Sequence, residues 1–179
     1  MAIELYLGHG ASGTAASMAP FVDGLRARGL AATAVDLPKR RAEDAVAAWC
    51  AAVPDLATVA VGGHSYGGRV ASLAAARPEA PYAALVLFSY PLHPPGGPER
   101  AAARVAHWPA IRCPVLLLSG EADPFARLAL LREATTELRD AELVTYPRLG
   151  HTLRPVLDDV LDRTAAFLQR AATTSISIR

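Results

Sequence analysis

Short apolar runs alternate with longer amphipathic stretches along the chain. Six nearly continuous apolar runs have the length of strands, and we predict strands at Ile3–Leu7, Ala31–Leu37, Ala57–Val61, Ala84–Ser89, Pro114–Leu118 and Glu142–Tyr146. Stretches with helical periodicity or composition lie between them and end near glycine or proline; we predict helices at Phe21–Arg28, Ala42–Val53, Tyr66–Arg77, Phe125–Arg139 and Pro155–Gln169. Strands that are apolar throughout are typical of sheets covered on both faces. The pattern therefore predicts an α/β fold, with a six-stranded parallel sheet and helices on both faces.

Length and composition indicate one globular domain. The chain has 179 residues, and 52% of them are hydrophobic, as in ordinary folded proteins. We expect the domain to span residues 1–170. The tail, residues 171–179, has no clear hydrophobic pattern, and we expect it to be disordered or loosely held. Residues 91–109 contain five prolines and two glycines, which predicts one long irregular segment.

Charge and cysteine content exclude several classes of function. The net charge of +1 argues against capture of nucleic acid or of an anionic membrane. We interpret Lys39-Arg40-Arg41 as a solvated loop. Cys50 and Cys113 have neither metal-type spacing nor partners for a disulfide framework, so they are expected to be free thiols. No apolar run reaches membrane-spanning length and no leader pattern is present, which favours a cytoplasmic protein.

A serine lies in a Gly-x-Ser-x-Gly motif, Gly63-His64-Ser65-Tyr66-Gly67. The motif follows the predicted strand Ala57–Val61 and precedes a helix-like stretch. In a nucleophile elbow the serine sits on a sharp turn between strand and helix, with its hydroxyl exposed above the sheet. Gly63 and Gly67 supply the small residues that such a turn requires on both sides. We predict that Ser65 is a nucleophile, which needs an acid and a histidine further along the chain.

Both partners follow in the expected order. Asp123 lies just past the predicted strand Pro114–Leu118, and His151 follows the last predicted strand. Glu121 competes for the role of the acid, but Asp123 lies further out on its loop, where reach to a histidine is needed. Asp123 is also suited to capping the helix expected after Pro124, and the two roles are compatible. We predict a Ser65–His151–Asp123 catalytic triad.

The loop Gly8-His9-Gly10-Ala11-Ser12-Gly13 follows the first predicted strand. Acyl transfer develops an oxyanion, which two backbone N–H groups must already face. We predict that Tyr66, directly after the nucleophile, and Ala11, in this loop, supply them. The alternatives are a phosphate cradle or a plain tight turn, although the loop lacks the lysine of a P-loop.

Four motifs, the glycine-rich loop, the serine turn, the acid loop and the histidine loop, together span residues 3–151. They resemble those of the α/β-hydrolase superfamily. The chain is most similar to its short, lidless, dienelactone-hydrolase-like branch, but it carries Ser65 where true dienelactone hydrolases carry cysteine, which argues against a dienelactone substrate. Residues 67–72 and 90–99 resemble a subgroup of that branch in which some members are scaffold proteins. The resemblance therefore implies the α/β-hydrolase fold with no lid domain, and leaves a non-catalytic interaction domain as an alternative to an enzyme.

The chemistry that these residues favour is hydrolysis of small carboxylic esters, with thioesters or small amides as alternative substrates of the same triad. The site implies no metal and no organic cofactor. The segment between Tyr90 and Cys113 is too short and too rich in proline for a helical cap, so we expect an open, shallow site. Its expected walls, besides Tyr66, are Leu92, His93, Trp108 and Phe125; core packing of Leu92 and Trp108 is the alternative.

Overall fold

The computed structural model describes residues 3–177 and, among these, the side chains up to residue 173. One six-stranded parallel sheet crosses the molecule in the order β2-β1-β3-β4-β5-β6. Its strands are β1 (Glu4–Gly8), β2 (Ala31–Val35), β3 (Val59–His64), β4 (Ala84–Phe88), β5 (Val115–Gly120) and β6 (Ala141–Tyr146). The predicted α/β fold with six parallel strands is confirmed.

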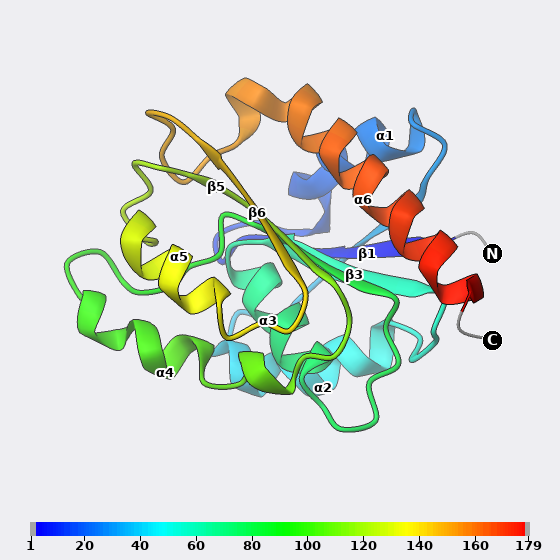
Figure 1. Cartoon of the computed structure of the whole chain (residues 1–179), viewed down its shortest axis with the longest axis horizontal. Coiled ribbons are helices and arrows are strands. Elements are labelled where there is room, and N and C mark those ends of the chain that lie inside the picture. Colours follow the sequence, from blue (N-terminus) through cyan, green and yellow to red (C-terminus); the bar gives the residue numbers. More distant parts are fainter. Residues whose placement is uncertain (1–2, 178–179) are drawn as a thin grey trace.

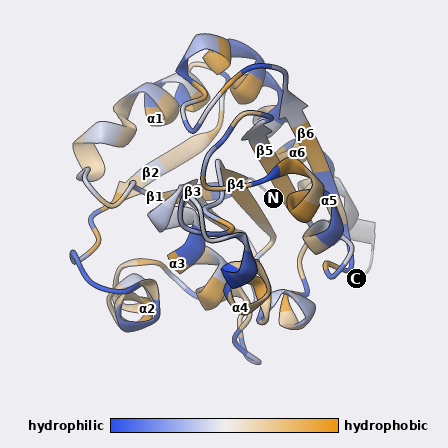
Figure 2. Cartoon of the chain, turned by 90° about the vertical axis from the view of Figure 1, so that its left-hand side faces the viewer, coloured by the Kyte–Doolittle hydropathy of each residue, from blue (hydrophilic) through white to orange (hydrophobic). Residues whose placement is uncertain are grey.

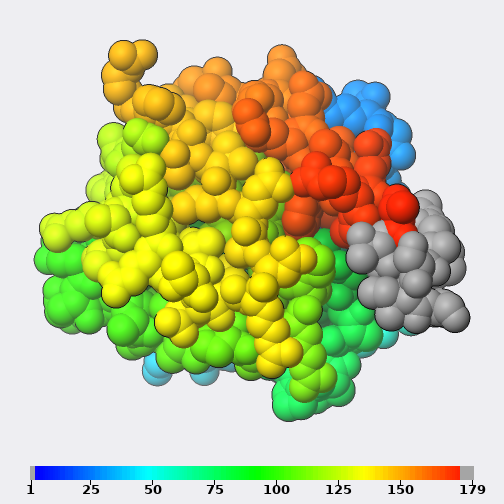
Figure 3. All heavy atoms as spheres, viewed as in Figure 1, coloured from blue at the N-terminus to red at the C-terminus, as the bar shows by residue number. Residues whose placement is uncertain are grey.

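Helices cover both faces of the sheet (Figure 1). Helices α1 (Ala19–Arg26) and α6 (Leu157–Ser177) lie on one side, and α2 (Ala42–Ala52), α3 (Tyr66–Ala75), α4 (Ala101–Val105) and α5 (Leu128–Thr135) lie on the other. Short 3₁₀ helices occur at Ala15–Met18, Pro98–Arg100, Trp108–Ala110 and Arg154–Val156. Helix α5, the edge strand β6 and helix α6 make up much of the face seen in Figure 3.

The alternation of side chains along the strands divides the core into two layers. Leu85 and Leu87 of β4 pack with the residues under α2 and α3, whereas Val86 and Phe88 pack with those under α1 and α6. All four side chains are fully buried. In Figure 2 the strands carry hydrophobic colours, and hydrophilic colours predominate on the loops and outer helix turns.

Several element boundaries differ from those expected. The segment predicted to be irregular contains the short helix α4, because Ala101 and Val105 can bury their side chains against the core. Helix α5 begins at Leu128 rather than Phe125. The last helix continues beyond Gln169 to Ser177, so most of the segment predicted as a loose tail is helical, and residues 178–179 lie outside the described residues. Within the described residues, no helix is long and apolar enough to cross a membrane.

Candidate active site

Ser65 lies on a sharp turn between β3 and α3. Its backbone has φ 51° and ψ −113°, a conformation that is costly for a residue with a Cβ and that recurs at functional sites. Two backbone hydrogen bonds support the turn: the Ser65 N–H donates to Phe88 O at 2.9 Å, and the Gly67 N–H donates to His9 O at 2.9 Å. The end of β4 and the residue directly after β1 therefore hold the serine in place.

Glycines allow this turn to pack against the sheet. Gly63 has φ 158°, and a Cβ there would overlap Gly8 O. A Cβ at Gly67 would overlap the backbone of Gly8. The first turn of α3 therefore lies directly against the end of β1, as the small residues of the motif predict.

His151 and Asp123 lie beside the serine. The Ser65 Oγ is 2.8 Å from His151 Nε2, and His151 Nδ1 is 2.8 Å from Asp123 Oδ2. A carboxylate only accepts, so His151 donates from Nδ1 and its Nε2 accepts the Ser65 hydroxyl proton. The Asp123 side chain is fully buried, whereas that of His151 is 23% exposed. The structure thus brings the three predicted residues into one hydrogen-bonded series.

The loops after β5 and β6 are packed together, which fixes the distance between acid and histidine. A Cβ at Gly120 would overlap Leu149 O, and the Ala122 N–H donates to Leu149 O at 2.8 Å. The second Asp123 oxygen accepts the Phe125 N–H at 2.8 Å. Because α5 begins only at Leu128, this bond closes a local turn and does not cap the helix as expected.

Glu121, the competing acid, is turned away from the histidine. Its Oε1 accepts a hydrogen bond from the Thr145 hydroxyl at 2.8 Å. Thr145 belongs to β6, the edge strand. The geometry therefore favours Asp123 over Glu121 as the partner of His151.

The predicted oxyanion residues, Ala11 and Tyr66, border the same hollow as Ser65. Tyr66 is the first residue of α3, where backbone N–H groups have no partner within the helix and attract negative charge. Its hydroxyl donates to Pro38 O at 2.7 Å, which fixes the side chain. Both residues thus border the hollow that Ser65 borders, and their role as oxyanion donors stays a prediction.

Gly8, Gly10 and Gly13 have the Gly-x-Gly-x-x-Gly spacing of dinucleotide-binding loops, and Asp36 follows β2. The structure employs these residues differently. Gly8 packs against Gly67 of α3, and Asp36 Oδ1 accepts the Ala15 N–H at 2.6 Å. The carboxylate that would face a ribose in such a site is therefore occupied by the protein's own backbone.

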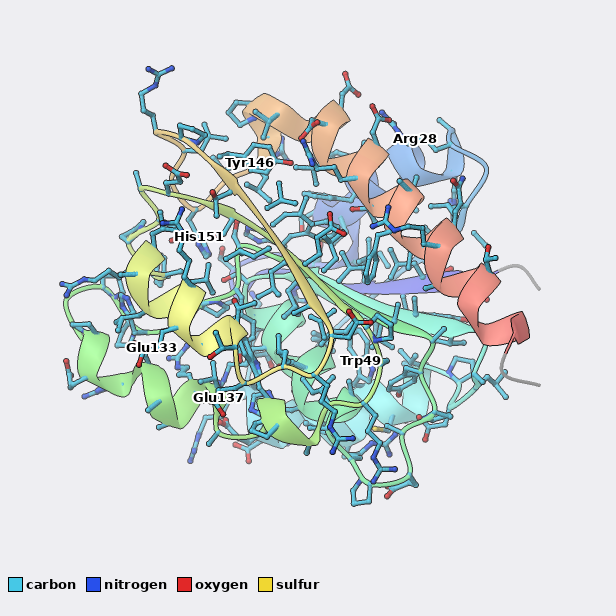
Figure 4. The ribbon with its side chains drawn as sticks, in the orientation of Figure 1. Arg28, Trp49, Glu133, Glu137, Tyr146 and His151 are labelled. Carbon is cyan, nitrogen blue, oxygen red and sulfur yellow. The ribbon has the colours of Figure 1, made fainter. Side chains whose placement is uncertain are left out.

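The hollow beside Ser65 has a volume of about 640 Å³. Of the predicted walls, Tyr66 and Phe125 line it, and the Phe125 ring lies 4.5 Å from the ring of His151. Figure 4 shows His151 close to the beginning of α5, the helix that follows Phe125.

The other three predicted wall residues are buried away from the hollow. Leu92 and Trp108 have no exposed surface and belong to the core beneath α3 and α5. His93 is 4% exposed; its Nδ1 donates to Pro94 O and its Nε2 accepts the Arg127 N–H. For Leu92 and Trp108 the structure shows the alternative, core packing, because apolar side chains gain more by entering the core than by facing solvent. His93 does not line the hollow because backbone groups occupy both of its ring nitrogens.

Sequence reasoning missed the charged lining of the hollow. Arg40 and Arg41, interpreted as part of a solvated loop, border it together with Arg100 and Arg104 from the proline-rich segment. No motif signals this, because the two segments are far apart in sequence and meet only through the packing of α4. Among the described residues, no group of three or more histidine, cysteine, aspartate or glutamate side chains could hold a metal ion.

A family model described as "Alpha/beta hydrolase domain" matches residues 3–178. The chain belongs to the α/β-hydrolase family. The predicted superfamily membership is thereby confirmed. Among curated proteins, no sequence matches this α/β hydrolase significantly.

Solved structures share the fold of this α/β hydrolase at low sequence identity. A Paleococcus ferrophilus monoacylglycerol lipase has a TM-score of 0.81 at 15% identity, over 96% of this chain and 97% of that one. Est1E from Butyrivibrio proteoclasticus, solved with ferulic acid bound, has a TM-score of 0.76 at 19% identity, over 96% and 90%. A dienelactone hydrolase from Anabaena variabilis has a TM-score of 0.70 at 24% identity, over 94% and 87%. These likenesses establish the fold alone.

Proposed function

We propose that this α/β hydrolase is a serine hydrolase that cleaves small carboxylic esters through a covalent acyl-enzyme. The observation that carries the proposal is the series Ser65 Oγ, His151 Nε2, His151 Nδ1 and Asp123 Oδ2, with both hydrogen bonds at 2.8 Å. A nucleophile, a base within reach of its proton and a buried acid that orients the base are what acyl transfer requires.

In the first half of the reaction, Ser65 Oγ attacks the ester carbonyl carbon while His151 Nε2 takes its proton. The Asp123 carboxylate stabilises the resulting imidazolium, and the N–H groups of Ala11 and Tyr66 hold the oxyanion. The carbon–oxygen bond to the alcohol then breaks, and the leaving alkoxide takes the proton from His151. Water, activated by the same histidine, hydrolyses the acyl-Ser65 ester and restores the enzyme.

The strained backbone at Ser65 supports the same assignment. A positive φ at a residue other than glycine persists only where the surrounding structure enforces it, and here the end of β4 and His9, directly after β1, both bond to the turn. Among the fold's structural neighbours are an esterase and a monoacylglycerol lipase by name. This likeness favours ester chemistry over other reactions of the same triad.

The test is a panel of p-nitrophenyl esters from acetate to palmitate, assayed with the native protein and with Ser65→Ala. We expect turnover of the short esters and a loss of about 10⁴-fold or more in kcat for the variant. Labelling by a fluorophosphonate should modify the native protein and spare Ser65→Ala. A native protein that neither turns over the esters nor reacts with the probe would be a non-catalytic interaction domain, and the proposal would be rejected.

A further inference from the structure

Five arginines and a single acidic residue line the hollow beside Ser65. They are Arg40, Arg41, Arg69, Arg100, Arg104 and Glu43. The five guanidinium groups against one carboxylate leave an excess of four positive charges in the lining, in a chain whose net charge is only +1. The positive charge of this protein is therefore concentrated where a substrate must enter, and a concave wall of one sign raises the local concentration of oppositely charged ligands.

Two of these arginines are fixed by the protein itself. Arg69 pairs with Glu43 through a short contact and donates from Nη1 to Arg104 O at 2.9 Å. Arg104 is partly buried and donates from Nη1 to Pro91 O at 3.0 Å. Glu43 is thus already engaged by Arg69, and Arg41 lies 3.8 Å from its second oxygen. These contacts hold two positive charges in place in the lining of the hollow.

The other three arginines are exposed at the rim and are loosely held. Arg40 and Arg41 come from the loop before α2, and Arg100 immediately precedes α4. Arg41 meets Glu43 and Arg100 meets Glu99 only at 3.8 Å, a separation at which exposed ion pairs contribute little. Their guanidinium groups remain available for a ligand that enters the hollow.

The arginines also repel one another. Burial lowers the pKa of Arg104, and the neighbouring Arg69 and Arg100 lower that pKa further, while Tyr90 and Glu43 partly offset them. A lowered pKa at a guanidinium means that its charged form is disfavoured by its surroundings. An anion bound in the hollow would offset this repulsion.

We propose that the substrate of this site is an acyl ester or thioester that carries phosphate groups, which the arginines of the hollow bind. The inference rests on the proposed hydrolase function and names its substrate class. Arginine binds phosphate through paired, charge-assisted N–H donors. A single carboxylate offers two oxygens and one charge, too few to match an excess of four positive charges, whereas a diphosphate offers more of both.

The reaction of such a substrate needs no further reactant than water. Ser65 Oγ forms a bond to the acyl carbon, and the bond from that carbon to the leaving oxygen or sulfur breaks. The leaving group takes the proton that His151 removed from Ser65. Water then adds to the acyl-enzyme and releases the carboxylic acid, so the phosphate groups serve binding alone and remain chemically unchanged.

Binding is tested first, without catalysis, by titrating Ser65→Ala with inorganic pyrophosphate in a calorimeter. We expect saturable binding that weakens as the salt concentration rises. The double variant Arg40→Gln/Arg100→Gln on the same background should weaken it by about tenfold or more, since charge-assisted hydrogen bonds are lost. Arg112→Gln, an exposed arginine that precedes β5 outside the hollow, is the matched control and should leave binding unchanged.

Turnover is tested with pairs of substrates that differ only in phosphate. S-acetyl-4′-phosphopantetheine against S-acetylpantetheine examines phosphate on the leaving group. The pair p-nitrophenyl phosphonopropionate and p-nitrophenyl butyrate examines a phosphonate, as a phosphate analogue, on the acyl side. We expect kcat/KM to be at least about tenfold higher for the anionic member of one pair, and this ratio to fall in Arg40→Gln/Arg100→Gln and to persist in Arg112→Gln.

Failure of the phosphate site and failure of the hydrolase function would give different results. If neutral esters are hydrolysed but pyrophosphate does not bind and neither pair shows a preference, the inference about phosphate is overturned and the hydrolase function stands. A preference for p-nitrophenyl hemisuccinate equal to that for the phosphonate would also overturn it, because a single carboxylate would suffice. If pyrophosphate binds but no ester is turned over, the anion site stands and the hydrolase function fails.

Discussion

The His64 ring lies against the histidine loop, with its Nε2 3.1 Å from the backbone carbonyl oxygen of His151. Since a carbonyl only accepts, His64 donates this hydrogen bond from Nε2. Burial lowers the pKa of His64, which keeps its ring neutral near pH 7. His64, the residue directly before Ser65, therefore holds the backbone of His151. Two hydrogen bonds thus join the two segments, one between the Ser65 and His151 side chains and one from His64 to the His151 carbonyl.

Replacing His64 by Leu should lower kcat on p-nitrophenyl acetate by about tenfold, because a freed His151 loop lets the Nε2 drift from Ser65 Oγ. KM should change much less, since His64 does not border the hollow. The measurement is a steady-state comparison of kcat and KM with those of His64→Gln, whose side-chain amide can still donate to the carbonyl. Equal losses in both variants would indicate that the hydrogen bond has no positioning role.

The assembly of Ser65, Asp123 and His151 could be predicted because their positions depend on topology alone. Each follows a strand of a parallel sheet, and the carboxyl ends of parallel strands lie at one edge. Their order along the chain then brings them together once the sheet order β3-β4-β5-β6 is formed. Their roles in catalysis stay predictions until Ser65→Ala is assayed.

The walls of the site could not be predicted, because they depend on side-chain direction in irregular segments. Trp108 and Leu92 are apolar residues in a proline-rich stretch, and no periodicity indicates whether such residues face the core or a substrate. Arg100 borders the hollow in a segment that Arg69 of α3 holds through a hydrogen bond to Arg104 O. Its approach to Arg40 follows from packing between distant segments, which the sequence pattern does not encode.

Gly67→Ala should destabilise the protein by about 3 kcal/mol or more. The added methyl group overlaps the backbone of Gly8, and relief of that overlap would require β1 or α3 to shift. Gly150→Ala is the control, since the nearest atom to a Cβ there is Ala122 O at 4.0 Å. Both can be compared by urea denaturation. A Gly67→Ala protein as stable as Gly150→Ala would contradict the close packing of the elbow against β1.

His107 should make the stability of the protein sensitive to acid. Burial, and next the positive charge of Arg69, lower the pKa of His107 from 6.5 to about 4, and its Nε2 lies 2.8 Å from Ser72 Oγ. The unfolded chain therefore binds a proton more readily than the folded one between these values. The contribution of the neutral ring is complete above pH 6.5 and is lost as the pH falls toward 4.

The measurement is the free energy of unfolding in urea at pH 7.5 and at pH 5, for the native protein and for His107→Gln, which keeps a polar group near Ser72. We expect the native protein to lose about 1–2 kcal/mol more than the variant between these two pH values. Parallel pH dependences in the two proteins would show that another group is responsible.

Asp123→Asn should lower kcat by about 10³- to 10⁴-fold, as expected when the histidine is held in the wrong tautomer. An amide at this position can still accept the Phe125 N–H through its oxygen, so the loop keeps its shape. Its NH₂ group then faces His151 Nδ1 and favours the tautomer with the proton on Nε2, which cannot accept the proton of Ser65.

Glu121→Gln provides the matched test of the competing acid, because its side chain contacts Thr145 and not the histidine. We expect Glu121→Gln to retain kcat within about threefold; a larger loss there than in Asp123→Asn would reverse the assignment of the acid.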